Sequence, residues 1–182
     1  MRNLLSDRRL RAMYAGGRDG PGARWYARLW AAAFGRGLSS RRWVTLEVTG
    51  RRTGRVARFP LGMADWDGQW YLVSMLGEDC NWVRNVRAAS GRAVLRRRRA
   101  VACQLAEVPA AERPEIIRRY LQKVPGGRPH VPVSKDAPLP EFAAISPRYP
   151  VFRVIPLDGR LPGPRRARGA GAVASATAGG AK

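Results

Sequence analysis

The sequence predicts an α+β fold that is mainly β, a small antiparallel β-barrel with flanking helices. Five or six short segments have the alternating or apolar pattern of β-strands. Most of these segments are separated by short turns that contain Gly or Asp, which is typical of hairpins. The 182 residues, 45% of them apolar, are enough for one domain with a core.

The first predicted strands form a meander. Trp43–Thr49 alternates between apolar and polar residues, as a half-buried strand does. Arg55–Met63 follows, and Pro60 within it indicates an edge or a bulge. The third strand is Gln69–Met75, and the Asp67-Gly68 pair before it favours a tight hairpin turn.

A short helix is predicted next, from Asn81, which would be its N-cap, to Ala89, with Gly91 beyond its end. Arg96–Arg99 lies within a strand pattern, where alternate side chains point to opposite faces. The remaining predicted elements are two strands, a helix, a Pro- and Gly-rich loop, a short helix and a last strand: Ala93–Arg98, Ala100–Glu107, Pro109–Gln122, Pro125–Pro140, Leu139–Ile145 and Tyr149–Ile155.

We expect three regions along the chain. Residues 1–40 form a helical segment, in which Trp25–Phe34 has an aromatic face that either packs on the core or lies at a membrane surface. Residues 41–160 form the barrel, and residues 161–182 form a disordered Ala/Gly/Arg tail. No secretion signal or membrane span is visible, so we expect a cytoplasmic protein, with membrane association as an open alternative.

The net charge of +21 predicts an anionic partner: a phosphorylated cofactor, an anionic membrane or nucleic acid. A compositional bias toward Arg, Ala and Gly is an alternative explanation. Two cysteines without a CxxC motif, Cys80 and Cys103, indicate neither a disulfide framework nor a zinc site, and no metal is expected. The single histidine, His130, is expected to face solvent.

Two segments have the residues of an anion site. In 50–55 (GRRTGR), glycines allow a tight turn whose N–H groups can form a nest for an anion, beside three arginines and Thr53. The spacing is that of neither a Walker loop nor a dinucleotide fingerprint. In 74–85, a strand ends, a Gly-containing loop follows and a helix begins, and a helix N-terminus offers free N–H groups and partial positive charge.

These two segments together resemble the deazaflavin-dependent nitroreductase and quinone reductase family. Members have a TGR(K/R)(S/T)G turn, a Pro-Leu pair in the next strand and a W-x-x-N-L-(K/R)-A helix. The matching segments here are 49–54 (TGRRTG), 60–61 (PL) and 82–88 (WVRNVRA). The resemblance covers residues 44–108, with a looser match at 151–155.

The resemblance implies a flavin-reductase-like split β-barrel that binds coenzyme F-420, a deazaflavin with a phosphodiester and a polyglutamate tail; FMN is the less favoured alternative. Arg51, Arg52 and Thr53 would hold the phosphate and the acidic tail. The strand beneath the ring would be formed by Arg58, Phe59, Pro60, Leu61, Gly62 and Met63. The backbone at the ring edge would come from Ser74, Met75, Leu76 and Gly77. The phosphate end would be closed by Asn81, Trp82, Val83, Arg84 and Asn85.

The implied activity is hydride transfer from reduced F-420 to a quinone, a nitroaromatic compound or a similar small acceptor, without an obligatory catalytic side chain. The sequence departs from the family at Ala57, where an arginine is common, and at Leu76, where relatives have a small hydroxyl residue. Tyr120 and Tyr149 are candidates for tyrosines near the acceptor, and Ser74, a tyrosine or water for the proton source. A non-catalytic ligand-binding barrel, a basic nucleic-acid-binding protein and a homodimer remain open alternatives.

Overall fold

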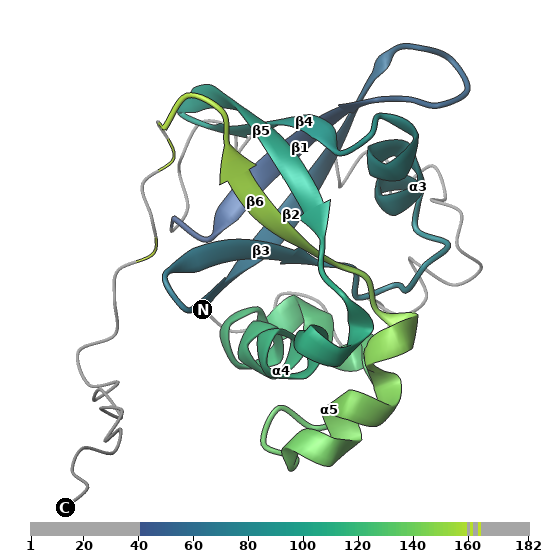
Figure 1. The fold of residues 1–182 in the computed structure, drawn as a ribbon, viewed down its shortest axis with the longest axis vertical. Helices are drawn as coiled ribbons and strands as arrows, with labels where there is room; N and C mark the ends of the chain where they lie inside the picture. Colours follow the sequence, from purple (N-terminus) through teal and green to yellow (C-terminus); the bar gives the residue numbers. More distant parts are fainter. Residues whose placement is uncertain (1–40, 160, 162–163, 165–182) are drawn as a thin grey trace, which may run out of the picture.

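Six antiparallel strands close into a β-barrel in the order β1-β2-β3-β6-β5-β4 (Figure 1). The computed structural model describes residues 41–159, 161 and 164. The predicted antiparallel barrel with flanking helices is therefore confirmed. The strands are β1 (Trp43–Thr49), β2 (Val56–Trp66), β3 (Gln69–Val73), β4 (Arg92–Arg97), β5 (Arg99–Glu107) and β6 (Val151–Pro156).

Local sequence explains the hairpins that join the first strands. Asp67 and Gly68 both have positive φ, 44° and 69°, and this geometry matches the twist of the strands on either side. The predicted Asp-Gly hairpin is thus confirmed. Pro60 pairs with Thr45 of β1, and pairing of β2 with β3 begins only at Met63, so Pro60 lies where β2 has a single partner strand.

The core inside the barrel also includes one side of helix α3 (Asn81–Ala88). Trp82 of α3 packs edge-on against Phe152 of β6, with ring centroids 5.4 Å apart. Val83 and Val86 on the same helix are fully buried in the same cluster. Helix α3 is therefore fixed to the barrel by apolar burial, which also fixes the direction of its polar side.

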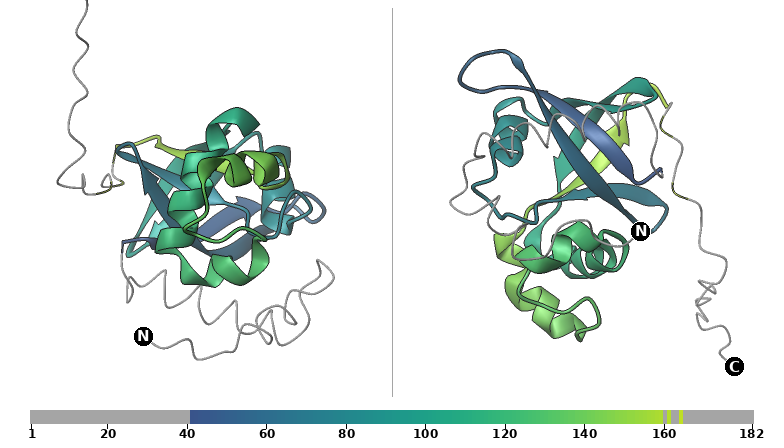
Figure 2. Two further views of the ribbon diagram at one scale, coloured as in Figure 1. Left: turned by 90° about the horizontal axis from the view of Figure 1, so that it is seen from below. Right: turned by 180° about the vertical axis from the view of Figure 1, so that it is seen from behind.

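A second core lies outside the barrel, where α4 (Arg113–Lys123) and α5 (Leu139–Ile145) lie together on one side of it (Figures 1 and 2). Ile117 and Leu121 of α4 are fully buried there. Three short 3₁₀ segments connect this layer: η1 (Ala110–Glu112), η2 (Pro125–His130) and η3 (Ser146–Arg148).

Buried Arg113 ties the helical layer to the barrel. Its guanidinium donates to the carbonyl oxygens of Val108 at 2.8 Å and of Ser146 at 3.2 Å, and to Glu107 Oε1 at 3.2 Å. These bonds hold the end of β5 beside η3. Because η3 directly precedes β6 in the chain, the same bonds also hold the start of β6.

Several predicted boundaries are wrong for identifiable reasons. β3 ends at Val73 because residues 74–77 form a turn, and β6 starts at Val151, after Tyr149. β2 runs on to Trp66, and the helix predicted from Pro109 begins with η1 and becomes α-helical at Arg113. The predicted loop 125–140 contains η2.

The run Arg96–Arg99 is not a strand interior. It forms the β4–β5 hairpin, with Arg98 at the turn and a φ of 59°. The expected N-terminal helical segment 1–40 and almost all of the expected tail 161–182 lie outside the described residues. Within the described part, no helix has the length and apolar character needed to cross a membrane.

Candidate functional site

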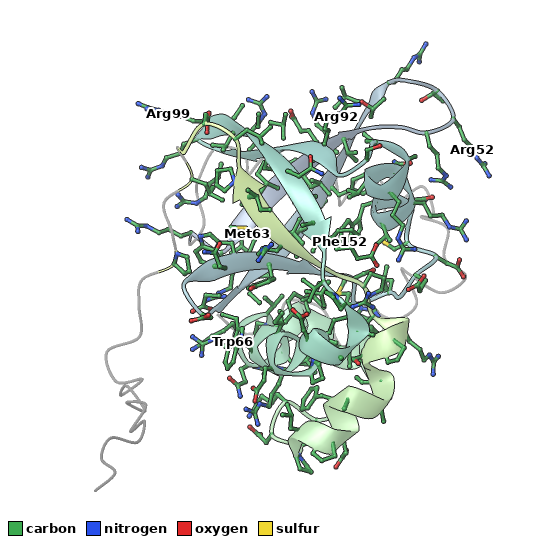
Figure 3. The ribbon with its side chains drawn as sticks, in the orientation of Figure 1. Arg52, Met63, Trp66, Arg92, Arg99 and Phe152 are labelled. Atoms are coloured by element: carbon green, nitrogen blue, oxygen red, sulfur yellow. The ribbon has the colours of Figure 1, made fainter. Side chains whose placement is uncertain are left out.

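The corner between β1 and β2 is a compact turn that displays arginines. Gly50 N–H donates to the Arg55 carbonyl oxygen at 2.8 Å, and Gly54 N–H donates to the Gly50 carbonyl oxygen at 2.9 Å. Gly54 has a φ of 67°, which side chains with a Cβ rarely adopt. Arg52, at the tip of this corner, points away from the barrel (Figure 3).

Thr53 stabilises the turn. Its Oγ1 accepts a hydrogen bond from the backbone N–H of Arg55 at 3.3 Å. Its hydroxyl is exposed and retains its own proton for donation. The corner thus combines exposed guanidinium groups with an exposed hydroxyl, all of which can bind an anion.

Arg51 joins this corner to helix α3. Its Nη1 donates to Asn85 Oδ1 at 2.9 Å, and its backbone N–H donates to the same oxygen at 3.3 Å. The guanidinium also reaches Asn81 Oδ1 at 3.5 Å. Asn85 is 5% exposed, so this link is partly shielded from water. Two segments about thirty residues apart in the sequence therefore meet in the fold.

Helix α3 does not begin with a cap at Asn81. The N-cap is Cys80, which makes no side-chain capping hydrogen bond, so the predicted capping role of Asn81 is wrong. Asn81 is instead the first helical residue, exposed beside Arg51. Arg84, expected at the phosphate end, forms an ion pair with Asp79 of the preceding loop.

Not all of the expected site residues face open space. Trp82 and Val83 are buried in the barrel core, and so is Met63 of β2. Gly62 is also closed off, because a Cβ there would lie 2.9 Å from Val124 Cγ1. Arg58 points to Glu47, to which its Nε donates at 3.0 Å. Of the β2 segment, the partly exposed residues are thus Phe59, Pro60 and Leu61.

Glu47 has an unusual setting for a carboxylate on a barrel strand. Glu47 is only 8% exposed. Its Oε1 accepts a hydrogen bond from Arg96 Nε at 2.9 Å in addition to the bond from Arg58. Hydrogen bonding by Arg96, and then by Arg58, holds the pKa of Glu47 below its usual value although burial opposes this. Arg58 is therefore committed to a structural pair and does not replace the arginine that the family often has at position 57.

The loop between β3 and α3 opens with a tight turn. Ser74 is fully buried, its Oγ donates to the Gly77 carbonyl oxygen at 2.7 Å, and Gly77 N–H donates back to the Ser74 carbonyl oxygen at 3.2 Å. Ser74 is therefore a poor proton source. Gly77 has a φ of 80°, and a Cβ there would lie 3.3 Å from the Arg148 carbonyl oxygen.

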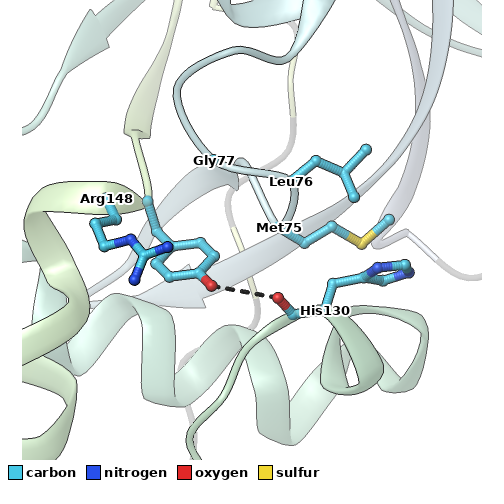
Figure 4. A pocket seen from close by; sticks show the side chains of 6 residues that line it. Met75, Leu76, Gly77, His130 and Arg148 are labelled. Carbon is cyan, nitrogen blue, oxygen red and sulfur yellow. Dashed lines mark hydrogen bonds between the residues drawn. The ribbon is translucent and has the colours of Figure 1, made fainter. Parts of the chain in front are cut away.

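Beside this turn lies a pocket of about 250 Å³. It is lined by Met75, Leu76, Gly77, His130, Arg148 and Tyr149, of which Figure 4 labels all but the tyrosine. The turn thus brings three of the expected ring-edge residues to a cavity. His130, expected to face solvent, lines this cavity. The sequence did not identify Arg148 as a site residue. The one indication of it in the sequence was that it directly precedes Tyr149, a candidate tyrosine near the acceptor.

Two tyrosines border this region. Tyr149 OH donates to the His130 carbonyl oxygen at 3.3 Å (Figure 4). Burial raises the pKa of Tyr149, and nearby Arg148 partly opposes this. Tyr120 is buried in the helical layer, and its hydroxyl lies 3.7 Å from Met75 Sδ. Tyr149 therefore lines the pocket, whereas Tyr120 contacts the Met75 side chain from helix α4.

Comparisons with known proteins place these features in a family. The sequence profile of the F-420H(2)-dependent quinone reductase family matches residues 23–137, which is more than half of the chain. A search of curated proteins gave no significant match.

Several solved structures resemble the chain. An F-420-H2 dependent reductase, FDR-A, is 22% identical over 63% of this chain and 94% of that one, with a TM-score of 0.43. A structure described as a domain-swapped dimer is 19% identical over 72% and 94%, with a TM-score of 0.46. A protein of unknown function from Agrobacterium tumefaciens is 12% identical over 71% and 53%, with a TM-score of 0.48. On the strength of the profile match, the chain belongs to the F-420H(2)-dependent quinone reductase family, a family of oxidoreductases.

Proposed function

We propose that this protein binds coenzyme F-420 between the β1–β2 corner and helix α3 and reduces a small quinone, nitroaromatic or similar acceptor. The observation that carries the proposal is the Arg51–Asn85 hydrogen bond of 2.9 Å. It joins the arginine-bearing corner to the helix that follows the Ser74–Gly77 turn. One continuous stretch of chain, residues 74–85, then connects an anion-binding end to a pocket.

The donors at the corner fit the anionic tail of this coenzyme. Within the described part of the chain, no carboxylate pairs with the guanidinium groups of Arg52 and Arg55. They can therefore bind phosphate and carboxylate oxygens without first breaking an ion pair. The expected phosphate residues Arg51 and Thr53 would bind beside them, and Asn81 and Asn85 would position Arg51.

The ring would lie along the Ser74–Gly77 turn. When bound, the reduced coenzyme supplies a hydride from C5 of its ring. The chain orients the reactants: the buried Ser74 hydroxyl fixes the turn, and the turn presents Met75 and Leu76 beside the pocket. Rigid placement of the two reactants is the main contribution that such a site makes to the rate.

The acceptor would enter the pocket that Leu76 and Tyr149 help to line. Leu76, in place of a small hydroxyl residue, makes this wall apolar. Tyr149 keeps its proton at neutral pH, but its raised pKa makes it a weak acid and its hydroxyl already donates to the His130 carbonyl oxygen, so it would have to leave that bond to protonate an acceptor oxygen. Water is the alternative proton source.

The test of cofactor choice is a parallel titration with F-420 and FMN, followed by fluorescence. We expect saturable binding of F-420 at lower concentration than of FMN, and oxidation of reduced F-420 when benzoquinone is added. Saturable F-420 binding without reduction of any quinone or nitro compound would instead support a non-catalytic carrier. Absence of F-420 binding would overturn the proposal.

Arg52→Ala tests the tail-binding role. The variant should weaken binding of F-420 roughly tenfold, about 1.4 kcal/mol, and leave binding of its core without phosphate and glutamates nearly unchanged. Arg99→Ala is the matched control, because Arg99 is also an exposed arginine but lies at the other side of the barrel (Figure 3). Equal losses in the two variants would mean that only net charge matters.

A further inference from the structure

We propose that the acceptor of this enzyme is a single-ring aromatic compound with a carboxylate or a similarly acidic substituent, and that Arg148 selects it. This inference rests on the proposed function, since it concerns the same pocket. It adds the chemical class of the acceptor and the residue that distinguishes it from a neutral one.

The size of the pocket sets the first limit. Its volume is about 250 Å³. An apolar cavity of about 150 Å³ holds one benzene ring, so this pocket has room for one ring with a substituent. Met75, Leu76 and the ring of Tyr149 provide apolar contact for such a ring.

Charge sets the second limit. Arg148 lines the pocket, and no Asp or Glu is among the lining residues. Within the described part of the chain, Arg148 takes part in no ion pair and no side-chain hydrogen bond, whereas Arg84, Arg87 and Arg113 all have carboxylate partners. Its positive charge at the pocket is therefore not neutralised by the protein.

The backbone of Arg148 is held in place by its neighbours, while its side chain is exposed to solvent at the mouth of the pocket. Its backbone carbonyl lies against Gly77, at the end of η3, and buried Arg113 donates to the Ser146 carbonyl oxygen of the same segment. Figure 4 shows Arg148 among the side chains that line the pocket. A carboxylate on the ring of the acceptor could therefore pair with Arg148 while the ring contacts Met75 and Leu76. A guanidinium binds a carboxylate through two parallel hydrogen bonds, which a neutral ester or amide cannot reproduce.

Direct binding tests the inference without turnover. The probes are 4-(trifluoromethyl)benzoate and 4-(trifluoromethyl)benzamide, which are not reducible acceptors, with fluorine NMR line broadening as the measurement on the full chain. We expect the benzoate to bind at least fivefold more tightly than the benzamide. Arg148→Gln should remove this preference, and Arg153→Gln, which removes an equal charge from the exposed face of β6, should retain it.

Turnover provides the second readout. With reduced F-420, the wild type should have a higher kcat/KM for 4-nitrobenzoate than for its methyl ester, and Arg148→Gln should lower only the value for the acid, about tenfold. Equal values for acid and ester in the wild type, or equal loss of both in the variant, would overturn the role of Arg148. If F-420 itself does not bind, the proposed function fails, but the NMR result still decides whether the pocket selects an acidic ring.

Discussion

Arg51 of the β1–β2 corner donates a 2.9 Å hydrogen bond to Asn85, a buried asparagine on helix α3. The bond joins a solvent-exposed hairpin to a helix that is anchored in the barrel core by Trp82. The bond therefore fixes the position of the exposed β1–β2 corner relative to the loop 74–80. This link is the structural basis for the proposed binding site, which is made of two distant segments.

Replacing Asn85 by Ala tests the link. The variant leaves the Arg51 guanidinium without its best acceptor, so we expect a stability loss of about 1 to 2 kcal/mol in urea unfolding. The affinity for F-420 should fall roughly tenfold, because the corner is no longer held beside α3. Asn81→Ala is the control: Asn81 is exposed and its contacts are 3.5 Å, so a loss as large as that of Asn85→Ala would contradict the assigned role.

Glu47 should contribute to the pH dependence of stability. Because Arg96 and Arg58 lower its folded-state pKa, its contribution is fully present above the ordinary value of 4.5 and is lost as the pH falls through the folded-state pKa. We expect Glu47→Gln to lower the unfolding free energy by about 1 kcal/mol at pH 7, a modest amount because both arginines are partly exposed.

The difference between wild type and Glu47→Gln should then shrink as the pH falls below 4.5, because the carboxyl of the unfolded chain is protonated first and that of the folded protein only below its lowered pKa, where Glu47 is as uncharged as glutamine. Urea unfolding at several pH values, from neutral to acidic, measures it. A difference that stays constant across this range would show that the charge of Glu47 does not stabilise the barrel.

Gly77→Ala should affect the pocket specifically. Its φ of 80° makes any side chain unfavourable, and the added Cβ would press on the Arg148 carbonyl oxygen. Gly68→Ala is the matched control, since Gly68 has a φ of 69° but a Cβ there would have open space within 4 Å. Both variants should lose about 1 kcal/mol of stability, but only Gly77→Ala should lower kcat/KM for the acceptor. Equal acceptor kinetics in the two would argue against a pocket at this turn.

The two cysteines should react at very different rates. Burial raises the pKa of the Cys103 thiol to about 12, so it is protonated and shielded at neutral pH. Cys80, at the start of α3, is partly exposed. With Ellman's reagent at pH 8 we expect one thiol per chain to react rapidly and the second only after unfolding. Cys80→Ser should abolish the rapid phase, and a rapid phase that persists in this variant would mean that β5 opens readily.

The sequence by itself indicated the strands and the two segments that we propose bind the coenzyme, because both depend on local information. The alternation of Trp43–Thr49 and the Asp67-Gly68 turn are set by side-chain periodicity and backbone preference within a few residues. Periodicity does not reveal a strand end such as Val73, because a hydrogen bond from Ser74 to Gly77, and not a change in the apolar pattern, ends the strand.

Only the tertiary structure decided which residues meet. Periodicity does not specify that Arg51 would contact Asn85, that Arg58 would pair with Glu47, or that Arg148 would come to lie beside Gly77. These contacts join residues 11 to 71 positions apart. The Arg58–Glu47 pair follows from the β1–β2 register, and the other two follow from the packing of α3 beside the corner and of η3 against the 74–77 turn. Barrel closure fixes the register of all six strands together, so it is a property of the whole chain that no single segment contains.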